Sequence, residues 1–159
     1  MKEIPLTQGQ VALIDDEDFE RVNKFKWQAT KKRNGYYARR SVYGGNSIYL
    51  HSFIMNTRSQ LDHIDHNGLN CQKINLRLAN HSQNQQNTKK KNSGTSQYKG
   101  VSWNGKKWFA QIKINGITKY IGLYDNEIDA AKAYDLEAEK LFGEFAQLNF
   151  SSDSSYKVD

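Results

Sequence analysis

The sequence predicts an α+β protein built from two small folding units. Three observations lead to this fold class. Short runs of β-branched and aromatic residues bounded by Gly and Asn-Gly turns occur in both halves of the chain, and one long amphipathic helix pattern lies near the C-terminus. Between them, TKKKNSGTSQ (residues 88–97) has three consecutive lysines, a Ser-Gly pair and no apolar residue, which is typical of a linker. A chain of 159 residues that is 37% hydrophobic suits two small cores better than one large core.

The first predicted unit, residues 1–87, begins with a scaffold of short elements. Glu3 to Leu13 alternates and carries a TQGQ turn, so we expect a hairpin there. DDEDFERVNKFKW predicts a short helix, which Asp15 or Asp16 can cap. GYYARRSVYGGNSIYLHSFIM predicts two strands around a Gly-Gly turn, and the second strand leads into a helix. The basic residues of this scaffold could also contact phosphate: Lys31, Lys32, Arg33, Arg39 and Arg40.

The second predicted unit, residues 98–150, is a three-stranded antiparallel sheet packed on one helix, and a tail (residues 151–159) follows it. YKGVSW, KKWFAQIKIN and ITKYIGLY are the expected strands, joined by Asn-Gly turns. Asn126 is expected to cap a helix that ends near Phe142, where Gly143 stops it. Its predicted buried stripe consists of Ala131, Tyr134, Ala138 and Leu141. Period-two alternation puts Trp108, Ala110, Ile112 and Ile114 on the helix side of the central strand, and Lys107, Phe109, Gln111 and Lys113 on the other side.

The charge distribution indicates a nucleic-acid partner. The net charge is +6, and from His66 to Tyr124 there is no acidic residue but there are ten basic ones. An acid-free basic segment is expected of a protein that binds a phosphate backbone, although it could also be an ordinary solvated surface. No apolar run reaches membrane-spanning length, the start has no signal-peptide core, and a single cysteine excludes an internal disulfide. We therefore expect a soluble intracellular protein.

The segment Leu61 to Asn87 concentrates the side chains that carry chemistry. It holds three of the four histidines, six asparagines, two aspartates and the only cysteine. We expect a strand ending in Asp62-His63, a loop, a second strand at residues 75–78 and a helix opening near His81. Asp62 and Asn84 offer oxygen ligands to a divalent cation, His63 can activate a water molecule, and Asn75 can orient His63. Such a site can hydrolyse a phosphodiester.

LDHIDHNGLN and INLRLANHSQNQQN resemble the HNH nuclease motif, with its ββα-metal fold, of phage and intron-encoded homing endonucleases. The resemblance extends upstream through YLHSFIM and LTQGQVALIDDEDF. It implies His63 as general base, Asn75 as the orienting residue, and Asp62 and Asn84 as ligands of Mg²⁺ or Mn²⁺. His81 is a rival to Asn84, because many family members have histidine at the third motif position. The resemblance also implies a cytoplasmic location in a phage-infected or bacterial host cell.

Residues 98–150 resemble the plant Apetala/ethylene-response-factor DNA-binding domain, whose sheet enters the major groove. YKGVSW, KWFAQIKINGITKYIGLY and AAKAYDLEAEKLFGEFAQLNF carry this resemblance. The DNA-contacting positions that it implies are Lys99, Ser102, Lys107, Gln111, Lys113, Thr118 and Tyr120. Several of these are arginine or tryptophan in the plant proteins, so the plant target sequence is not transferred. From the linker we expect backbone contacts by Lys89, Lys90 and Lys91.

Together these features predict a metal-dependent, site-directed DNA endonuclease of the homing type. The first unit would cut, and the linker and second unit would hold double-stranded DNA. We expect the protein to act as a monomer, with no membrane partner and no small-molecule cofactor besides the metal. Two alternatives stay open: a catalytically inactive DNA-binding protein or regulator, and a structural or packaging-associated phage protein with nuclease activity.

Overall fold

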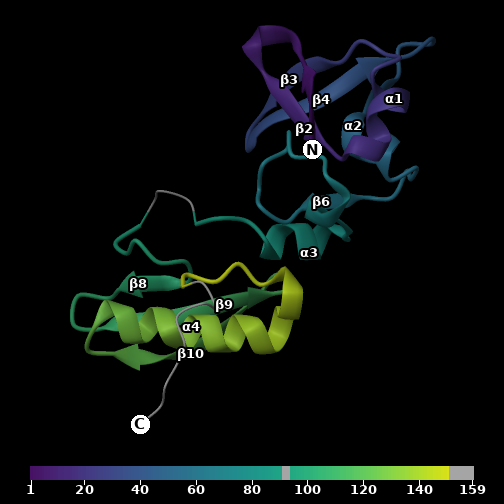
Figure 1. The fold of residues 1–159 in the computed structure, drawn as a ribbon. Coiled ribbons are helices and arrows are strands. Elements are labelled where there is room, and N and C mark those ends of the chain that lie inside the picture. Colours follow the sequence, from purple (N-terminus) through teal and green to yellow (C-terminus); the bar gives the residue numbers. More distant parts are fainter. Residues whose placement is uncertain (91–93, 151–159) are drawn as a thin grey trace. The chain divides into compact units, whose positions relative to one another are not determined.

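A computed structural model describes residues 1–90 and 94–150 and divides the chain into two compact units (Figure 1). The first unit is Met1–Asn84, and the second begins at Gln85. Within the described residues, the first unit has three antiparallel sheets and the second has one, and each unit has its own core, which agrees with the predicted α+β class. The predicted domain boundary at Asn87 remains a prediction, and Lys91 and the predicted tail lie outside the described residues.

The first unit begins with a hairpin of β1 (Lys2–Pro5) and β2 (Val11–Ile14), as predicted. A 3-10 turn (Asp16–Asp18) and the short helix α1 (Phe19–Val22) follow it. The next sheet has the order β3-β4-β5 and contains β3 (Gln28–Lys32), β4 (Gly35–Ser41) and β5 (Ser47–Tyr49). β5 leads directly into α2 (Leu50–Ile54), as predicted. The unit ends with β6 (Leu61–His63), β7 (Leu76–Leu78) and α3 (His81–Gln86), whose last two residues belong to the second unit.

The short helix expected in DDEDFERVNKFKW is confirmed as α1, but its predicted cap is wrong. The strand β3 was not expected, and it begins soon after the helix, at Gln28. β3 buries only Ala29 and otherwise carries polar residues, so it gives no period-two signal. Neither Asp15 nor Asp16 caps the helix, because the residue before α1 is Asp18, whose side chain makes no capping hydrogen bond. The Asp15 carboxylate accepts hydrogen bonds from Lys73 N (2.8 Å) and Gln72 Nε2 (3.2 Å) instead.

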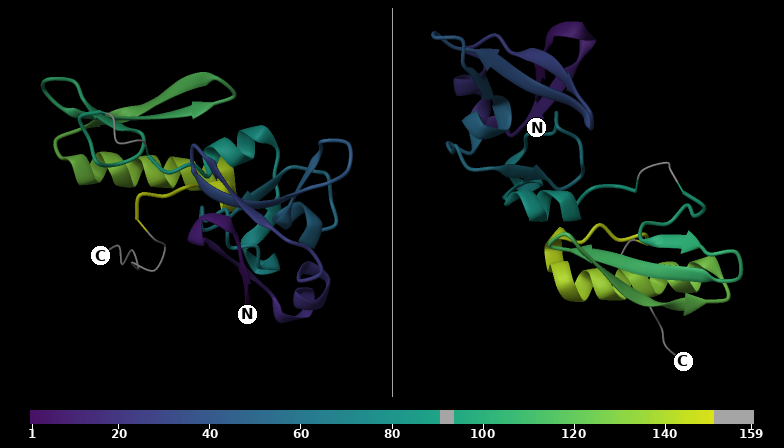
Figure 2. Two further views of the ribbon diagram at one scale, coloured as in Figure 1. Left: turned by 90° about the horizontal axis from the view of Figure 1, so that it is seen from above. Right: turned by 180° about the vertical axis from the view of Figure 1, so that it is seen from behind.

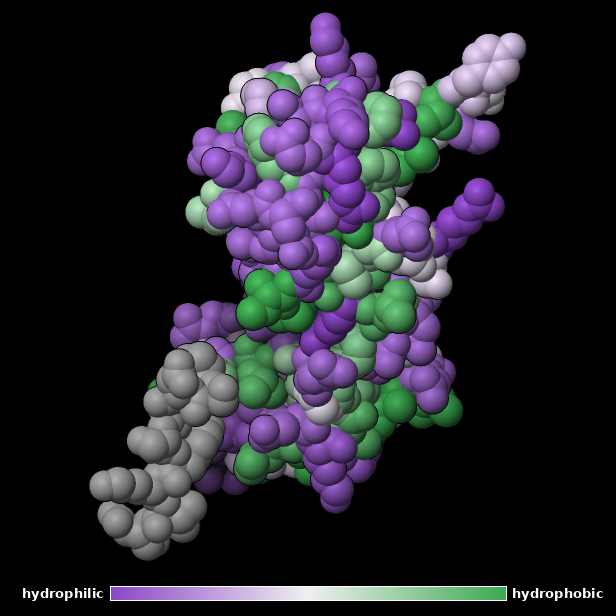
Figure 3. Space-filling view, turned by 45° about the vertical axis from the view of Figure 1, so that its right-hand side comes forward, coloured by the Kyte–Doolittle hydropathy of each residue, from purple (hydrophilic) through white to green (hydrophobic). Residues whose placement is uncertain are grey.

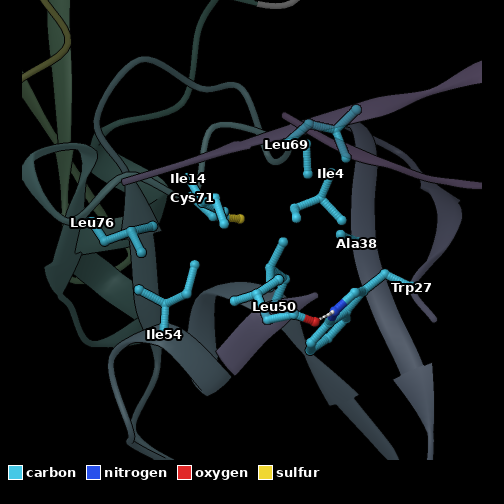
Figure 4. Packing of buried hydrophobic residues seen from close by; sticks show 11 residues of the cluster. Ile4, Ile14, Trp27, Ala38, Leu50, Ile54, Leu69, Cys71 and Leu76 are labelled. Carbon is cyan, nitrogen blue, oxygen red and sulfur yellow. Dashed lines mark hydrogen bonds between the residues drawn. The ribbon is translucent and has the colours of Figure 1, made fainter. Parts of the chain in front are cut away.

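The core of the first unit joins the hairpin, the β3-β4-β5 sheet and α2. Figure 4 shows side chains from these elements converging on one space, with Leu50 near its centre. Trp27 closes one side, and its Nε1 donates a 3.0 Å hydrogen bond to the carbonyl oxygen of Val22. Cys71 is fully buried in the same cluster, and burial raises the pKa of its thiol to about 12. This thiol is therefore a packing group and not a reactive one.

The second unit has the predicted three-stranded antiparallel sheet on one helix. The strands β8 (Val101–Trp103), β9 (Trp108–Ile114) and β10 (Ile117–Tyr124) form the order β10-β9-β8, and α4 (Glu127–Phe142) covers one face (Figure 2). Asn126 caps α4 by accepting a 2.8 Å hydrogen bond from Asp129 N. The predicted inward face is confirmed, since Ala110 and Ile112 are buried against α4.

The predicted burial of Leu141 is wrong, because its side chain is 38% exposed. Leu141 lies in the last turn of α4, where the next residue, Phe142, packs on the cluster of Ile112, Tyr134 and Ala138. The other three members of the predicted stripe are buried. The predicted stripe is therefore correct along most of α4, but at the end of the helix Phe142 is packed on the core in place of Leu141.

On the face seen in Figure 3, hydrophilic residues dominate and hydrophobic residues form small patches. Within residues 1–90 and 94–150, no helix combines the length and hydropathy needed to cross a membrane.

Candidate active site

The hairpin of β6 and β7 and the helix α3 bring the predicted site residues together. The two strands pair antiparallel, with Asp62 opposite Arg77 and His63 opposite Leu76. Asn75 immediately precedes β7, and Asn84 lies on α3, where its Nδ2 donates a 3.3 Å hydrogen bond to the carbonyl oxygen of Leu61. The residues Asp62, His63 and Asn75 are each only 7% exposed. Four polar side chains thus gather around one short strand.

The Asp62 carboxylate is paired with Arg77. Arg77 donates to the same oxygen, Oδ2, from Nη2 at 2.7 Å and from Nε at 3.0 Å. Both side chains are nearly buried. A buried carboxylate needs a cation or hydrogen-bond donors to compensate its lost hydration, and Arg77 supplies both.

The His63 ring lies among other rings. Its centroid is 5.0 Å from that of His51 and 5.7 Å from that of Tyr37, both edge to face. Burial lowers the pKa of His63 below its ordinary value, although the nearby carboxylates of Asp65 and Asp62 act in the opposite direction. The imidazole is therefore neutral at pH 7, which is the form that can accept a proton.

Asn75 fixes the backbone that follows His63. Its carbonyl oxygen accepts from Ile64 N at 3.0 Å, and its Oδ1 accepts from Asp65 N at 3.0 Å. Its Nδ2 donates to Asp65 Oδ1 at 2.9 Å and to the carbonyl oxygen of Asn70 at 2.8 Å. These bonds hold the two residues that follow His63 and the far end of the loop.

Asp65 is a site residue that the sequence reasoning missed. Burial raises its pKa, but hydrogen bonds from Asn70, the Asn67 amide and Asn75 outweigh burial and leave the pKa below its ordinary value. The Asp65 carboxylate is thus charged and ties the two ends of the β6–β7 loop together. The sequence signal that could have identified Asp65 is its position in the motif, between His63 and Asn75.

Asn84 and His81 differ in their surroundings. His81 is the first residue of α3 and is exposed, whereas Asn84 lies one turn later, is partly buried and contacts β6. Within the described part of the chain, no three His, Cys, Asp or Glu side chains are grouped to hold a metal ion. The donor set that could hold a hard divalent cation is thus the Asp62 carboxylate with one amide oxygen, a combination that suits Mg²⁺ or Mn²⁺. By chemistry these residues fit such an ion.

The predicted DNA-contacting lysines have unequal surroundings. Lys89 is exposed, whereas the Lys90 ammonium donates to the carbonyl oxygen of Ser96. Lys99 Nζ donates to the carbonyl oxygens of Gln86 (2.6 Å) and Thr88 (2.8 Å). Burial lowers the pKa of Lys99 to about 8, against the opposing effect of Asp135. Lys99 thus binds the main chain of its own unit.

The outer face of the second unit's sheet carries most of the other predicted contacts. Cross-strand partners lie on the same face, and the register pairs Gln111 with Tyr120 and Lys113 with Thr118. Ser102 pairs with Phe109 on the same outer side. Lys107 lies just before β9 and forms a 2.9 Å ion pair with Asp125. Among the residues of these pairs, Lys113 is an exposed lysine, and it lies beside amide, hydroxyl and aromatic groups.

A second acid-free segment was also overlooked. From Arg21 to Leu61 the chain has no acidic residue and nine basic ones. In the β3-β4-β5 sheet, Arg40 stacks over Phe25, with 3.9 Å between the guanidinium carbon and the ring centroid. Arg39 projects from the opposite face, where its Nη1 donates to Ser47 Oγ at 3.3 Å and Tyr49 is its cross-strand partner. The face that carries Arg39 also carries Tyr37, which contacts His63.

Comparison with known proteins gives two relatives. The chain is 37% identical over 150 residues to a protein of Acanthamoeba polyphaga mimivirus named as an uncharacterized HNH endonuclease, and the match covers 89% of this chain and 76% of that protein. It is also 39% identical over 75 residues to the AP2-like ethylene-responsive transcription factor ANT of Arabidopsis thaliana, a match that covers 40% of this chain and 14% of that protein. No protein-family model matches the chain, and neither does any solved structure. Because the viral relative is 37% identical and is matched over most of both chains, this chain belongs to the HNH endonuclease family.

Proposed function

We propose that the protein is a metal-dependent, site-directed DNA endonuclease of the homing type. The single observation that carries the proposal is His63: a buried imidazole, neutral at pH 7, beside the carboxylate of Asp62 on the motif strand. A neutral imidazole can take a proton from water at the moment that the water attacks phosphorus. The family membership of the chain supports the same reaction class.

In the proposed reaction, the residues of the chain bind and orient while His63 moves the proton. His63 removes a proton from the attacking water, a new phosphorus–oxygen bond forms, and the bond to the leaving sugar oxygen breaks. Asp62 and Asn84 would hold Mg²⁺ or Mn²⁺, and when bound this ion would stabilise the charge on the leaving oxygen. Arg77 keeps Asp62 in place, and Asn75 holds the loop that follows His63.

The second unit and the linker are proposed to hold double-stranded DNA. The resemblance of residues 98–150 to the Apetala/ethylene-response-factor domain supports sheet-first docking, and so does the three-stranded sheet backed by α4. α4 and its flanks, residues 125–144, contain seven acidic residues, so the helix side repels DNA while the sheet side attracts it. Lys89 and its neighbours would follow the backbone. In the first unit, Lys32 and Arg39 are placed to bind phosphates near His63, because both project from the sheet face that carries Tyr37.

One active site cuts one DNA strand, so we expect a monomer to nick double-stranded DNA. The proposed location is the cytoplasm of a phage-infected or bacterial host cell.

The alternative function is that of a catalytically inactive DNA-binding protein or regulator. The Asp62–Arg77 ion pair favours it, because a guanidinium already compensates the carboxylate that would hold a metal. Catalysis and binding must therefore be measured separately.

The test is cleavage of supercoiled plasmid in Mg²⁺, in Mn²⁺ and in EDTA, by the wild type and by His63→Ala. We expect nicked product that requires metal, and a loss of about 10²- to 10⁴-fold in rate without the general base. His81→Ala is the matched control, since it removes an exposed imidazole from the same motif and should be silent if Asn84 is the ligand. Unchanged cleavage by His63→Ala would overturn the proposal. Tight, salt-sensitive DNA binding without any cleavage would establish the inactive alternative.

A further inference from the structure

We propose that a cluster of three rings, those of Tyr37, Tyr49 and His51, positions the His63 imidazole, and that Gly68 is required to make room for the Tyr37 ring. These four are positioning residues, and none of them needs to touch the substrate for this role. The inference rests on the proposed function of His63 as the base. It explains how a side chain on a three-residue strand holds one orientation.

The ring contacts bound His63 on two sides. The His51 ring lies at an interplanar angle of 86° to His63, and the Tyr37 ring lies at 73°. The Tyr37 and His51 rings also contact each other, with 6.3 Å between their centroids. Edge-to-face contacts fix the plane of a ring as well as its position, so rotation of the His63 ring would disturb two neighbours at once.

The cluster is anchored on a sheet and a helix rather than on a loop. Tyr37 lies on β4, Tyr49 ends β5, and His51 lies in the first turn of α2. Tyr49 stacks on His51 with 5.4 Å between centroids and 12° between planes, and it contacts Tyr37 at 6.5 Å. Side chains that are supported by regular elements hold a functional group more accurately than loop residues do.

Gly68 shows that the position of the Tyr37 ring is tightly constrained. A Cβ atom at residue 68 would lie 2.6 Å from the Tyr36 carbonyl oxygen and 2.6 Å from Cε1 of Tyr37. Gly68 is not among the glycines with positive φ, so the backbone conformation alone does not require glycine here. The requirement is space: the β6–β7 loop passes against the Tyr37 ring, and any side chain would push the ring or the loop away.

The two supports of His63 are complementary. Asn75 holds the backbone of Ile64 and Asp65, directly after His63. The ring cluster holds the side chain, through residues of other elements. Loss of the cluster should therefore leave the hairpin intact while freeing the imidazole to rotate.

The experiment compares ring-removing and ring-keeping variants of the full chain. We expect Tyr37→Ala, His51→Ala and Gly68→Ala to lower kcat by about 10- to 100-fold under saturating DNA, the scale expected of a misplaced catalytic group. KM and the Kd for DNA should stay within about twofold, because the bound substrate does not depend on the His63 orientation. Tyr37→Phe and His51→Phe keep the rings and should retain kcat within about threefold of the wild-type value.

A readout independent of cleavage is the NMR shift of the His63 ring protons, which the neighbouring rings displace. The shifts should move in the alanine variants and stay near the wild-type values in the phenylalanine variants. Thermal unfolding identifies any variant that fails to fold. Because alanine is introduced at three separate sites, the test needs only those variants that remain folded. Wild-type kcat in folded Tyr37→Ala and His51→Ala proteins would overturn the inference. Unmoved His63 shifts would overturn it as well, even if the wild type cleaves nothing and the proposed function itself fails.

Discussion

At the scale of single residues, Asp62 contributes to the stability of the fold and is also a proposed metal ligand. Its carboxylate and the guanidinium of Arg77 are a nearly buried pair, with 9% and 11% of their side chains exposed. Removing one partner of such a pair leaves an uncompensated buried charge, at a cost of about 3–5 kcal/mol. Loss of activity in an Arg77 variant would thus mix folding with catalysis. His63 carries no such buried charge at neutral pH, which makes it the cleaner residue for testing the reaction.

His51 should make the first unit sensitive to acid. Burial lowers its pKa from 6.5 to about 4, with a smaller contribution from His63, and Tyr37 and Tyr49 are the other titratable groups that face it. Its Nδ1 is buried and finds no hydrogen-bond partner among the described residues. Because the unfolded state binds a proton near pH 6.5 while the folded state does not until about pH 4, stability is lost as the pH falls between these values.

The expected loss is at most about 3 kcal/mol, at about 1.4 kcal/mol per pH unit. Urea unfolding at pH 7 and pH 4.5, followed by amide signals of the first unit, measures it. His51→Phe keeps the ring and removes the titration, so its free energy of unfolding should fall less between the two pH values. Equal losses in both proteins would mean that the His51 pKa is not depressed in the folded state.

The sequence predicted the motif residues of the candidate site but not their neighbours. Asp62, His63, Asn75 and Asn84 lie in one short segment, so local spacing is enough to single them out. The contacts of Tyr37 and His51 with His63 depend on how the β3-β4-β5 sheet and α2 pack beside β6. No periodicity along the chain records that packing, which is why Tyr37 was interpreted only as scaffold and His51 only as a structural or packing residue near the site.

At the scale of elements, prediction succeeded where the local chemistry was decisive. The Asn115-Gly116 turn has positive φ at both residues, 49° and 85°, as a two-residue hairpin loop requires. The ends of α4 follow equally local signals, the cap at Asn126 and the stop at Gly143. β3 was missed because its polar residues lack alternation and its existence depends on pairing with β4. The predicted cap at Asp15 failed for a similar reason, because its carboxylate binds Gln72 and Lys73, which are far away in the sequence.

The N-terminal cap of α4 should contribute measurably to the second unit. Asn126→Ala removes the acceptor of the Asp129 amide and should lower the free energy of unfolding of this unit by about 1 kcal/mol. Urea unfolding followed by the amide signals of α4 gives the value. Asn126→Ser is the control, since a serine hydroxyl also caps and should cost less than half as much. A destabilisation that is the same for alanine and serine would show that the side-chain amide has another role.

At the scale of the whole molecule, acidic residues are confined to a few short parts of the sequence. Two acid-free segments, Arg21 to Leu61 and His66 to Tyr124, are separated only by a short stretch that contains the motif acids Asp62 and Asp65. The remaining acids lie in the first twenty residues, from Asp125 to Glu144, and near the end of the chain. Carboxylates are thus absent from most of the sequence on either side of the motif. This absence would be required if DNA contacts both units, because carboxylates repel the phosphate backbone.

The salt dependence of DNA binding should distinguish contact lysines from lysines that only add charge. Lys89 is exposed in the predicted linker, whereas Lys119 donates a 2.6 Å bond to Glu137 of α4. If Lys89 neutralises one phosphate, Lys89→Gln should reduce the slope of log Kd against log salt concentration by about 0.9 and weaken binding to all sequences alike. Lys119→Gln removes the same charge from the helix side and should leave the slope unchanged. Equal slope changes in both variants would mean that net charge, not a phosphate contact, attracts the DNA. A change in sequence preference alone for Lys89→Gln would mean that the linker reads bases instead of clamping the backbone.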